Sequence, residues 1–448
     1  MTTALDADRP GIPATDPPKR PRTPSVASRQ LASGLNVMAV RRSNVPRVEV
    51  RLRIPTGTSR PGDGARERLL AATLTSGTSA SDSVGLAERL QRVGGSLDAS
   101  AGVEEVVVGG SALANRLPEY LDLLGEVLTD AQYPAVEVEV HQGRIKQELT
   151  ILRSQPTVLA QHALLARMYP KHPYGRGLPD PEAVDAVNAA GLKRWHRKRV
   201  VPAGATLVLV GDFKPETALD KVAGALAEWT GAERAPGVPA LGAIEPGPTG
   251  FVDRPGAVQT NIRLGGPALD RTHSDYAALS VANLIFGGYF SSRLVTNIRE
   301  DKGYSYSPRS SIEHRQRGSQ LVVGAEVATN VTVPALAEIR HELTTMTNAL
   351  VGERELEAGK RYLVGTIALS IQTQAGLAST LASLAAHGLG VEYLRDHPKR
   401  IEQVTAEQVR ASAQEFLAVD RLVTVLVGDV HIIQGAVQAL DELDQTQL

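Results

Sequence analysis

The sequence predicts an α+β fold made of two homologous halves, each a mostly antiparallel sheet covered by helices. The first observation is a repeat: LVLVGDF at 207–213 returns as VTVLVGDV at 423–430, 217 residues further on. VNAAGL at 187–192 and VTAEQV at 404–409 keep the same offset, and each places a helix-capping residue before an amphipathic stretch. A helix, a strand and a Gly-Asp turn therefore recur in the same order in both halves.

A third match lies near the start of each half, where VRL at 50–52 recurs as IRL at 262–264 with an offset of 212 residues. Three ordered matches at nearly one offset indicate a duplication. Between the halves, residues 234–249 are dense in proline and glycine and have little apolar periodicity, as expected of a linker. We therefore predict one domain at 25–233 and a second at 250–448.

The first half mixes strand and helix patterns. LASGLNVMAV predicts a hairpin that turns near Ser33 and Gly34. Alternating apolar residues predict strands, a period of 3.6 predicts helices, and Pro156 restarts the last helix. The expected elements are a strand at 48–54, helices at 64–76 and 83–93, strands at 96–101 and 103–111, and helices at 115–129 and 135–168.

The second half repeats this order. Helices placed between adjacent antiparallel strands are typical of α+β domains, with the helices covering one face of the sheet. The expected elements are a strand at 257–265, helices at 272–286 and 291–300, strands at 304–316 and 319–327, and then several helices.

Composition excludes several classes of function. The absence of cysteine removes disulfides, thiolate metal sites and a cysteine nucleophile. With 48 basic and 49 acidic residues, the chain lacks the basic excess of a nucleic-acid-binding protein. No apolar run is long enough for a transmembrane helix, so we expect no membrane partner and a cytoplasmic location. The polar, proline-rich residues 1–24 predict a disordered arm.

Common catalytic motifs are absent. No phosphate-binding loop, dinucleotide fingerprint or nucleophile elbow is present, and the ten histidines form no i,i+4 pair of the kind that binds zinc on a helix. Gly287 and Gly288 lack the spacing of a phosphate loop and predict a sharp turn that permits close packing. His172, in the turn PKHPYG, predicts a structural role.

The order of elements, the duplication and several strings resemble the pitrilysin/insulinase family of zinc peptidases, the inverzincins, from about residue 28 onward. In that family a helix of the first half carries H-x-x-E-H shortly before a Gly-Thr turn. The two histidines and a glutamate about 75 residues later hold zinc, and the glutamate inside the motif is the general base. The matching stretch here is GARERLLAATLTSGT at 64–78.

Counting back from the Gly-Thr turn, the five motif positions read Arg-Leu-Leu-Ala-Ala, with Arg68 and Ala72 in place of the histidines and Ala71 in place of the base. Glu148 falls where the third ligand belongs, and its alternative role is an exposed helical residue paired with Arg144. Because a catalytic zinc site usually needs three protein ligands, the resemblance implies no metal or other cofactor bound by this chain and no peptide hydrolysis by it alone.

The second half keeps a different family feature. FGGYFSSRLVTNIREDKGYSYSP at 286–308 resembles the family's glycine-rich turn, helix and Arg–Tyr pair, with Arg299 and Tyr306 seven residues apart. We expect Arg299 to end a helix, Gly303 to permit a tight turn and Tyr306 to begin a strand, so that both polar tips face one cleft. Guanidinium and phenol groups can donate hydrogen bonds to a peptide carbonyl and to its developing oxyanion. The alternative is a surface ion pair and a half-buried strand residue.

In two-chain members of this family, one subunit carries zinc, the other carries the Arg–Tyr pair, and they pack like the halves of a clam. The resemblance implies that this chain is the non-zinc half-clam of a heterodimeric zinc metallopeptidase, with an extended peptide as substrate. Zinc and an intact H-x-x-E-H are expected in the homologous partner. Two other hypotheses remain: a purely structural assembly subunit, and a zinc peptidase with rewired ligands. The substrate stays open among unfolded peptides, presequences and leader peptides.

Overall fold

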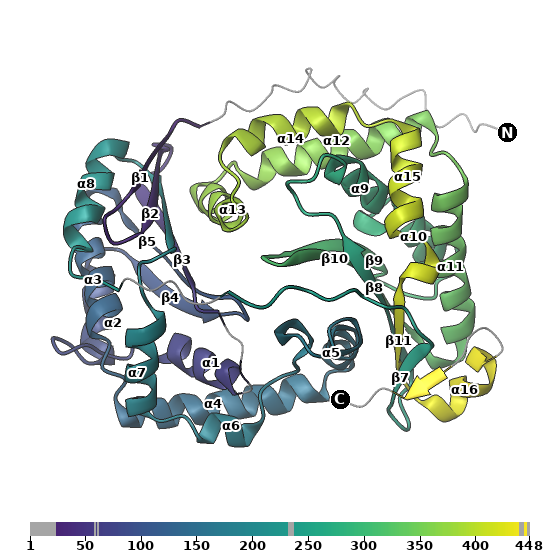
Figure 1. Cartoon of the computed structure of the whole chain (residues 1–448), viewed down its shortest axis with the longest axis horizontal. Helices are drawn as coiled ribbons and strands as arrows, with labels where there is room; N and C mark the ends of the chain where they lie inside the picture. The colour runs from purple at the N-terminus through teal and green to yellow at the C-terminus, as the bar shows by residue number, and fades with distance from the viewer. Residues whose placement is uncertain (1–23, 58–59, 61, 232–236, 439–442, 446–448) are drawn as a thin grey trace, which may run out of the picture.

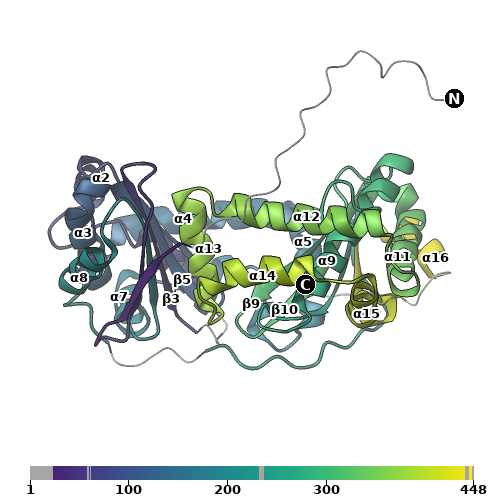
Figure 2. The same ribbon diagram turned by 90° about the horizontal axis from the view of Figure 1, so that it is seen from above.

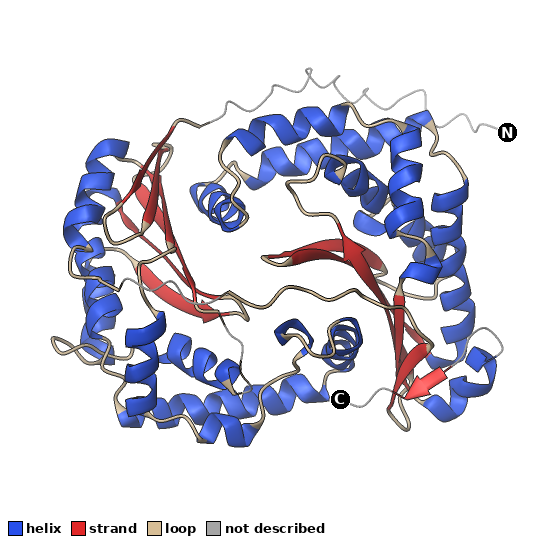
Figure 3. Ribbon diagram, in the orientation of Figure 1, coloured by secondary structure: helices blue, strands red, loops and turns tan. Residues whose placement is uncertain are grey.

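Two six-stranded sheets face each other across the centre of the molecule, with most helices on their outer sides (Figures 1 and 3). The computed structural model describes residues 24–57, 60, 62–231, 237–438 and 443–445. The predicted disordered arm, apart from Pro24, lies outside the described residues. Among the described helices, none has the length and apolar character needed to cross a membrane.

The first sheet confirms the predicted hairpin and central strand. Its hairpin turns at Gly34, whose φ of 84° suits glycine. One neighbouring pair, β2 with β6, is parallel and the other pairs are antiparallel. The strand order is β1 (Val26–Gln30), β2 (Asn36–Arg41), β6 (Thr206–Gly211), β3 (Arg47–Pro55), β5 (Glu105–Leu113) and β4 (Ser96–Ala101).

The second sheet has the same plan except at one edge. Its β7 and β11 form the parallel pair that matches β2 and β6, and its edge strand β9 matches β4. At the other edge β12 pairs with β7 in parallel, whereas β1 and β2 are antiparallel. The strand order is β12 (Leu443–Gln445), β7 (Thr249–Asp253), β11 (Val423–Gly428), β8 (Gln259–Ala268), β10 (Gly318–Ala328) and β9 (Arg309–Arg315).

The register confirms the duplication residue by residue. Arg51 lies opposite Val208, and Arg263 lies opposite Val425, which is 217 residues after Val208. Each of these arginines also donates from Nη1 to the carbonyl oxygen of its preceding residue, at 2.8 Å and 2.9 Å respectively. The two repeated strings therefore form the same cross-strand pair in both sheets.

The repeated glycine of the Gly-Asp turn is required by close packing. A Cβ on Gly211 would lie 2.4 Å from the carbonyl oxygen of Arg47, and a Cβ on Gly428 would lie 2.7 Å from Oγ1 of Thr260. Both distances are shorter than ordinary van der Waals contact. The neighbouring strand therefore explains why glycine closes the central strand of each half.

Helices of the first half cover the outer face of the first sheet and bury a core of leucines and valines (Figure 2). The predicted restart at Pro156 is confirmed, because Gln155 has extended backbone angles between two helices. The helices are α1 (Asp63–Thr73), α2 (Ser83–Arg92), α3 (Leu117–Asp130), α4 (Ala135–Ser154), α5 (Pro156–Met168), α6 (Pro181–Asp185), α7 (Ala189–Arg199) and α8 (Pro215–Ala225).

The second half has a longer helical part and two π-helices that the sequence pattern did not predict. Of the two π-helices, η4 (Thr296–Asp301) falls within segment 286–308, which resembles the family's glycine-rich region, and η3 (Leu284–Gly288) overlaps its start. The helices are α9 (Tyr276–Asn283), α10 (Arg293–Val295), α11 (Thr332–Asn348), α12 (Glu353–Ser370), α13 (Gln374–Ala386), α14 (Glu392–Glu402), α15 (Ala406–Phe416) and α16 (Val430–Gln438).

The halves exchange one helix each. On the inner face of the second sheet, Ala163 and Leu164 of α5 pack with Val425. On the inner face of the first sheet, Leu377 and Leu381 of α13 pack with valines of β2 and β6. Each sheet is thus covered on its outer face by its own half and on its inner face by a helix of the other half (Figure 1).

The tip of the β9–β10 hairpin ties the second half to the first. The backbone N–H of Gln316 donates to Oε1 of Glu104 at 2.8 Å, and the phenol of Tyr174 donates to the same carboxylate. His172 is buried and contacts the carbonyl oxygen of Pro239 through Nε2 at 3.0 Å. His172 is therefore structural, as predicted, and it contacts the predicted linker 234–249, of which the structure describes residues 237–249. The last of these residues, Thr249, begins β7.

Candidate functional site

The stretch that the resemblance assigns to a degenerate zinc motif lies on α1. Ala71 is buried and Ala72 packs partly buried against the core of the first half, so their methyl groups fill space between α1 and its neighbours. Arg68 keeps its side chain one-third exposed. Ala71 and Ala72, which the family resemblance places at a base and a ligand position, therefore carry no metal-binding atom.

Glu148 on α4 lies beside Arg68, because α1 packs against α4. Nη1 of Arg68 and Oε1 of Glu148 are 3.5 Å apart, so the expected helical pairing of Glu148 with Arg144 is wrong. The family resemblance predicted that Arg68 and Glu148 lie in one site, but it did not predict that their side chains form an ion pair. A guanidinium thus lies beside the carboxylate that the resemblance places at the third ligand position.

A cleft of about 410 Å³ beside α1 has Arg68 in its lining. Arginines outnumber carboxylates there, because Arg60, Arg68 and Arg176 line it together with Glu67 and Asp180. Burial, followed by the charges of Arg68 and Arg153, lowers the pKa of His162 on α5. Among the described residues, no group of three or more acidic or histidine side chains is arranged to hold a metal. The residues present do not fit zinc.

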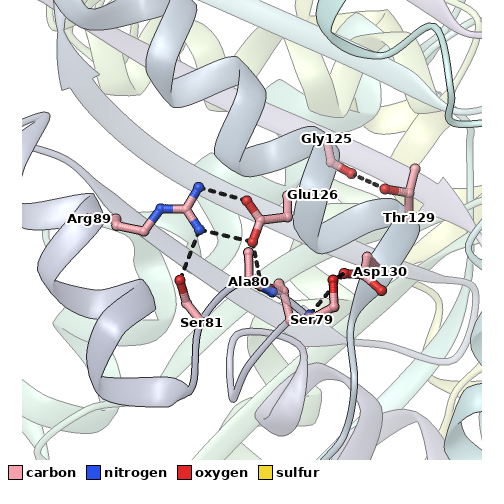
Figure 4. A network of polar contacts seen from close by, with 9 residues as sticks. Ser79, Ala80, Ser81, Arg89, Gly125, Glu126, Thr129 and Asp130 are labelled. Carbon is pink, nitrogen blue, oxygen red and sulfur yellow. Dashed lines mark hydrogen bonds and ion pairs between the residues drawn. The ribbon is translucent and has the colours of Figure 1, made fainter.

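The Gly-Thr turn that follows α1 has a structural explanation. Gly77 has a φ of 142°, and the hydroxyl of Thr78 donates to the Glu126 carboxylate. Arg89 donates to both oxygens of Glu126 at 2.9 Å and 2.7 Å, and the backbone N–H of Ser79 donates to Asp130 (Figure 4). The hydrogen bond from Arg89 is the main reason why the pKa of Glu126 is lowered.

Gly287 and Gly288 lie at the end of π-helix η3 and not in the predicted sharp turn, but the predicted close packing is present. A Cβ on Gly287 would lie 2.8 Å from Cβ and 3.1 Å from the backbone nitrogen of Ser310 on β9. Gly288 is less crowded, since its Cβ would meet Asn283 at 3.3 Å. Close packing against the edge strand therefore explains glycine at 287, while η3 continues directly from α9.

Arg299 and Tyr306 lie together on the surface of the second half. The Arg299 guanidinium carbon is 4.7 Å from the centre of the Tyr306 ring and 4.8 Å from the centre of the Phe290 ring. Nε of Arg299 also lies 3.2 Å from a carboxylate oxygen of Glu300. The guanidinium is thus stacked between two aromatic rings, an arrangement that cation–π attraction favours.

The backbone around this pair differs from the expectation in one respect. Arg299 lies near the end of a helix and Gly303 has a φ of 65°, both as predicted. Tyr306, however, lies in the loop before β9, which begins at Arg309, so its assignment to the start of a strand is wrong. Pro308 has no N–H to donate to a ladder, which explains why the strand begins after it.

Phe290 is the residue of this cluster that sequence reasoning missed. Its side chain is 62% exposed and that of Tyr306 is 80% exposed, although aromatic residues make up only 4% of the chain. The available signal was the position of Phe290, two residues after Gly288, in a chain with so few aromatic residues.

Comparison with known proteins decides the family. Residues 38–182 match the family described as Insulinase (Peptidase family M16), and residues 186–363 match the Peptidase M16 inactive domain. This chain belongs to peptidase family M16. An uncharacterized zinc protease of Mycobacterium leprae is 25% identical over 404 residues, 89% of this chain and 91% of that protein.

Two further comparisons describe where the chain stands within family M16. Bacillus subtilis YmfF, named a probable inactive metalloprotease, is 24% identical over 67% of this chain and 71% of its own length. The crystal structure of a peptidase M16 inactive domain from Pseudomonas fluorescens superposes with a TM-score of 0.83 at 24% identity, covering 90% of this chain and 98% of that one. The M16 fold is therefore shared over nearly the whole chain, and the matches fit a non-catalytic member.

Proposed function

We propose that this chain is the non-zinc subunit of a heterodimeric M16 zinc peptidase and that it presents Arg299 and Tyr306 to a peptide bound at the partner's active site. One observation carries the proposal. The first half has alanines and an ion pair at the zinc positions, while the second half exposes a cationic group between two aromatic rings. Exposed aromatic and arginine side chains are the ones most enriched at binding hot spots.

The side chains of Arg299 and Tyr306 are suited to bind a peptide while it is cleaved. The guanidinium and the phenol are donors that can hold a peptide carbonyl and stabilise the negative charge that develops on its oxygen. The partner's zinc, when bound, would polarise that carbonyl and supply the attacking water. Within sheet one, β4 is an edge strand, so an extended peptide can add to it through main-chain hydrogen bonds.

The partner is expected to carry an intact H-x-x-E-H and the zinc ion. The test is to produce this chain together with such a homologous chain from a neighbouring reading frame and to assay a quenched peptide. We expect hydrolysis by the complex, none by this chain alone, and zinc bound by the partner. Activity that is unchanged when this chain is left out would overturn the proposal.

A structural role is the second candidate, and one observation favours it. Arg299 is already held by Glu300 and by two rings, so the cluster can also serve to stiffen the loop before β9. An assembly subunit would increase the amount or stability of its partner without changing kcat or KM per partner chain. Kinetic comparison of complexes with and without the Arg299 and Tyr306 side chains distinguishes the two candidates.

A further inference from the structure

A cavity of about 660 Å³ lies in the second half and shares no lining residue with the cleft beside α1. It is bounded by residues of edge strand β9 and by helices α9, α12, α13 and α14, and it reaches Gly288 at the end of η3. Eight of its lining residues are serines or threonines. Neither the M16 resemblance nor the proposed role of Arg299 assigns a function to this cavity.

The charge of the lining is one-sided. Arg271 lines the cavity, and no aspartate or glutamate is among its described lining residues. Within the described part of the chain, Arg271 has neither an ion pair nor a hydrogen bond, and its side chain is half-buried. Its charge lowers the pKa of His397, whose shift is caused mainly by burial and then by Arg400 and Arg271. A half-buried guanidinium facing a hydroxyl-lined cavity is a recognition element for an anion.

A directed chain of hydrogen bonds fixes the wall beside Arg271. Ser319 donates to Asp270 at 2.8 Å, so its oxygen must accept from Nδ1–H of His314, 2.7 Å away. Nε2 of His314 is then unprotonated and accepts from the phenol of Tyr276 at 2.9 Å. Burial lowers the pKa of His314 to about 3, in agreement with a neutral ring. The phenol hydrogen is thereby committed to the protein.

Aromatic stacking completes this wall. The His397 ring lies between Tyr276, with centroids 5.3 Å apart, and Tyr393, with centroids 4.7 Å apart. Burial lowers the pKa of His397 to about 4, so both histidines are uncharged at neutral pH. Arg271 is then the one full positive charge among the described lining residues, and the rigid rings beside it reduce the entropy lost when a ligand binds.

We propose that this cavity binds a carboxylate, which pairs with the Arg271 guanidinium. The hydroxyls of Thr380 and Ser383 line the same cavity and form no hydrogen bond with other described residues, so they remain available as donors. The carboxylate has two possible sources: the C-terminus of a peptide, which would rest on the proposed peptidase role, or a small organic acid, which would not. Neither source depends on Arg299 or Tyr306.

The test uses the full-length chain and isothermal titration calorimetry at low ionic strength. The probes are acetyl-trialanine with a free C-terminus, the same peptide as its C-terminal amide, and succinate. We expect at least one carboxylate probe to bind, and the amide to bind at least 10-fold more weakly than the acid if the peptide is the ligand. Binding of succinate without the peptide acid identifies a small organic acid as the ligand.

Variants then test whether Arg271 supplies the positive charge that binds the carboxylate. Charged hydrogen bonds contribute enough that Arg271→Gln should weaken binding roughly 10- to 100-fold, with Arg271→Lys in between. Arg309→Gln, on edge strand β9 and not among the lining residues, is the control and should bind as the native chain does. Equal affinity for acid and amide together with no binding of succinate would overturn the proposal, as would unchanged affinity in Arg271→Gln. The acid–amide comparison needs no variant, so it holds even if Arg271→Gln misfolds.

Discussion

The two halves share one sheet plan, yet the hollows beside their edge strands are built differently. In the first half, the cleft next to α1 is lined by Arg60, Arg68 and Arg176 and also by Glu67 and Asp180, and Arg68 pairs with Glu148. In the second half, the cavity next to α9 is larger, lined by hydroxyls and free of acidic residues in its described lining. The second half also exposes an aromatic–guanidinium cluster made by Arg299, Phe290 and Tyr306. The two halves therefore kept the order of strands, except at one edge, after duplication, while the side chains that line the cleft and the cavity diverged.

The largest effect should come from removing the cluster of the second half. In the complex with a zinc-bearing partner, Arg299→Ala combined with Tyr306→Phe should lower kcat by roughly 100- to 1000-fold, the usual result of removing an oxyanion donor. Steady-state kinetics on a quenched peptide measures it. Tyr304→Phe, in the same loop, is the control and should retain activity. Native kinetics in the double variant would show that Arg299 and Tyr306 have no role in catalysis.

Crowding at Gly287 gives the next effect. Gly287→Ala places a Cβ 2.8 Å from Ser310, so we expect a loss of about 1–3 kcal/mol in the free energy of unfolding. Gly365→Ala in α12 meets nothing within 4 Å and should stabilise the chain by up to about 1 kcal/mol, because alanine favours helices. Urea unfolding at pH 7.5 compares the two. Equal effects would show that position 287 tolerates a side chain.

Acid should destabilise the second half through its neutral histidines. Burial lowers the pKa of His314 to about 3 and that of His397 to about 4, whereas an unfolded histidine titrates near 6.5. Between these values the unfolded state binds more protons than the native state, so the free energy of unfolding falls as the pH drops from about 6.5 toward 4.

The His397→Phe variant keeps a ring between the two tyrosines and removes the titrating group. Its free energy of unfolding should therefore change less with pH than that of the native chain, when urea midpoints are measured from pH 7 to pH 4.5. The difference in slope should correspond to about one proton taken up on unfolding. A slope identical to that of the native chain would contradict the neutral state inferred for His397.

The smallest effect should come from the first half. Arg68 and Glu148 are 33% and 57% exposed, so Arg68→Ala should change the free energy of unfolding by about 1 kcal/mol or less. A double-mutant cycle with Glu148→Ala measures the coupling between the two side chains. A coupling energy well above this range would mean that the ion pair, and not the core, holds α1 against α4.

Sequence reasoning found what repeats and what is local. The strings around Gly211 and Gly428 located the central strands of both sheets, and Pro156 located a helix boundary. Predictions that depend on a partner far along the chain fared worse. Glu148 pairs with Arg68 across two helices, because helical spacing indicates which neighbours are available but not which one tertiary packing selects.

The missed features have similar causes. Nothing in the periodicity of α5 or α13 shows that each lies on the other half's sheet, since an apolar face looks the same whatever covers it. The π-helices η3 and η4 escaped because their apolar pattern fits an ordinary helix. The repeated order of elements predicted a strand at 304–316 that includes Tyr306, but Pro308 has no N–H for the ladder and the strand begins at Arg309.

The exchange of α5 and α13 makes the two repeats a single cooperative unit. Removing either half would strip a cover from the valines of the remaining sheet, at a cost of roughly 1.5–3 kcal/mol for each large apolar side chain exposed. Neither half is then a foldon of its own, and thermal unfolding should proceed in one transition despite the duplicated architecture. Two fragments divided between the halves should regain the native fold only when mixed, as complementing pieces of one protein.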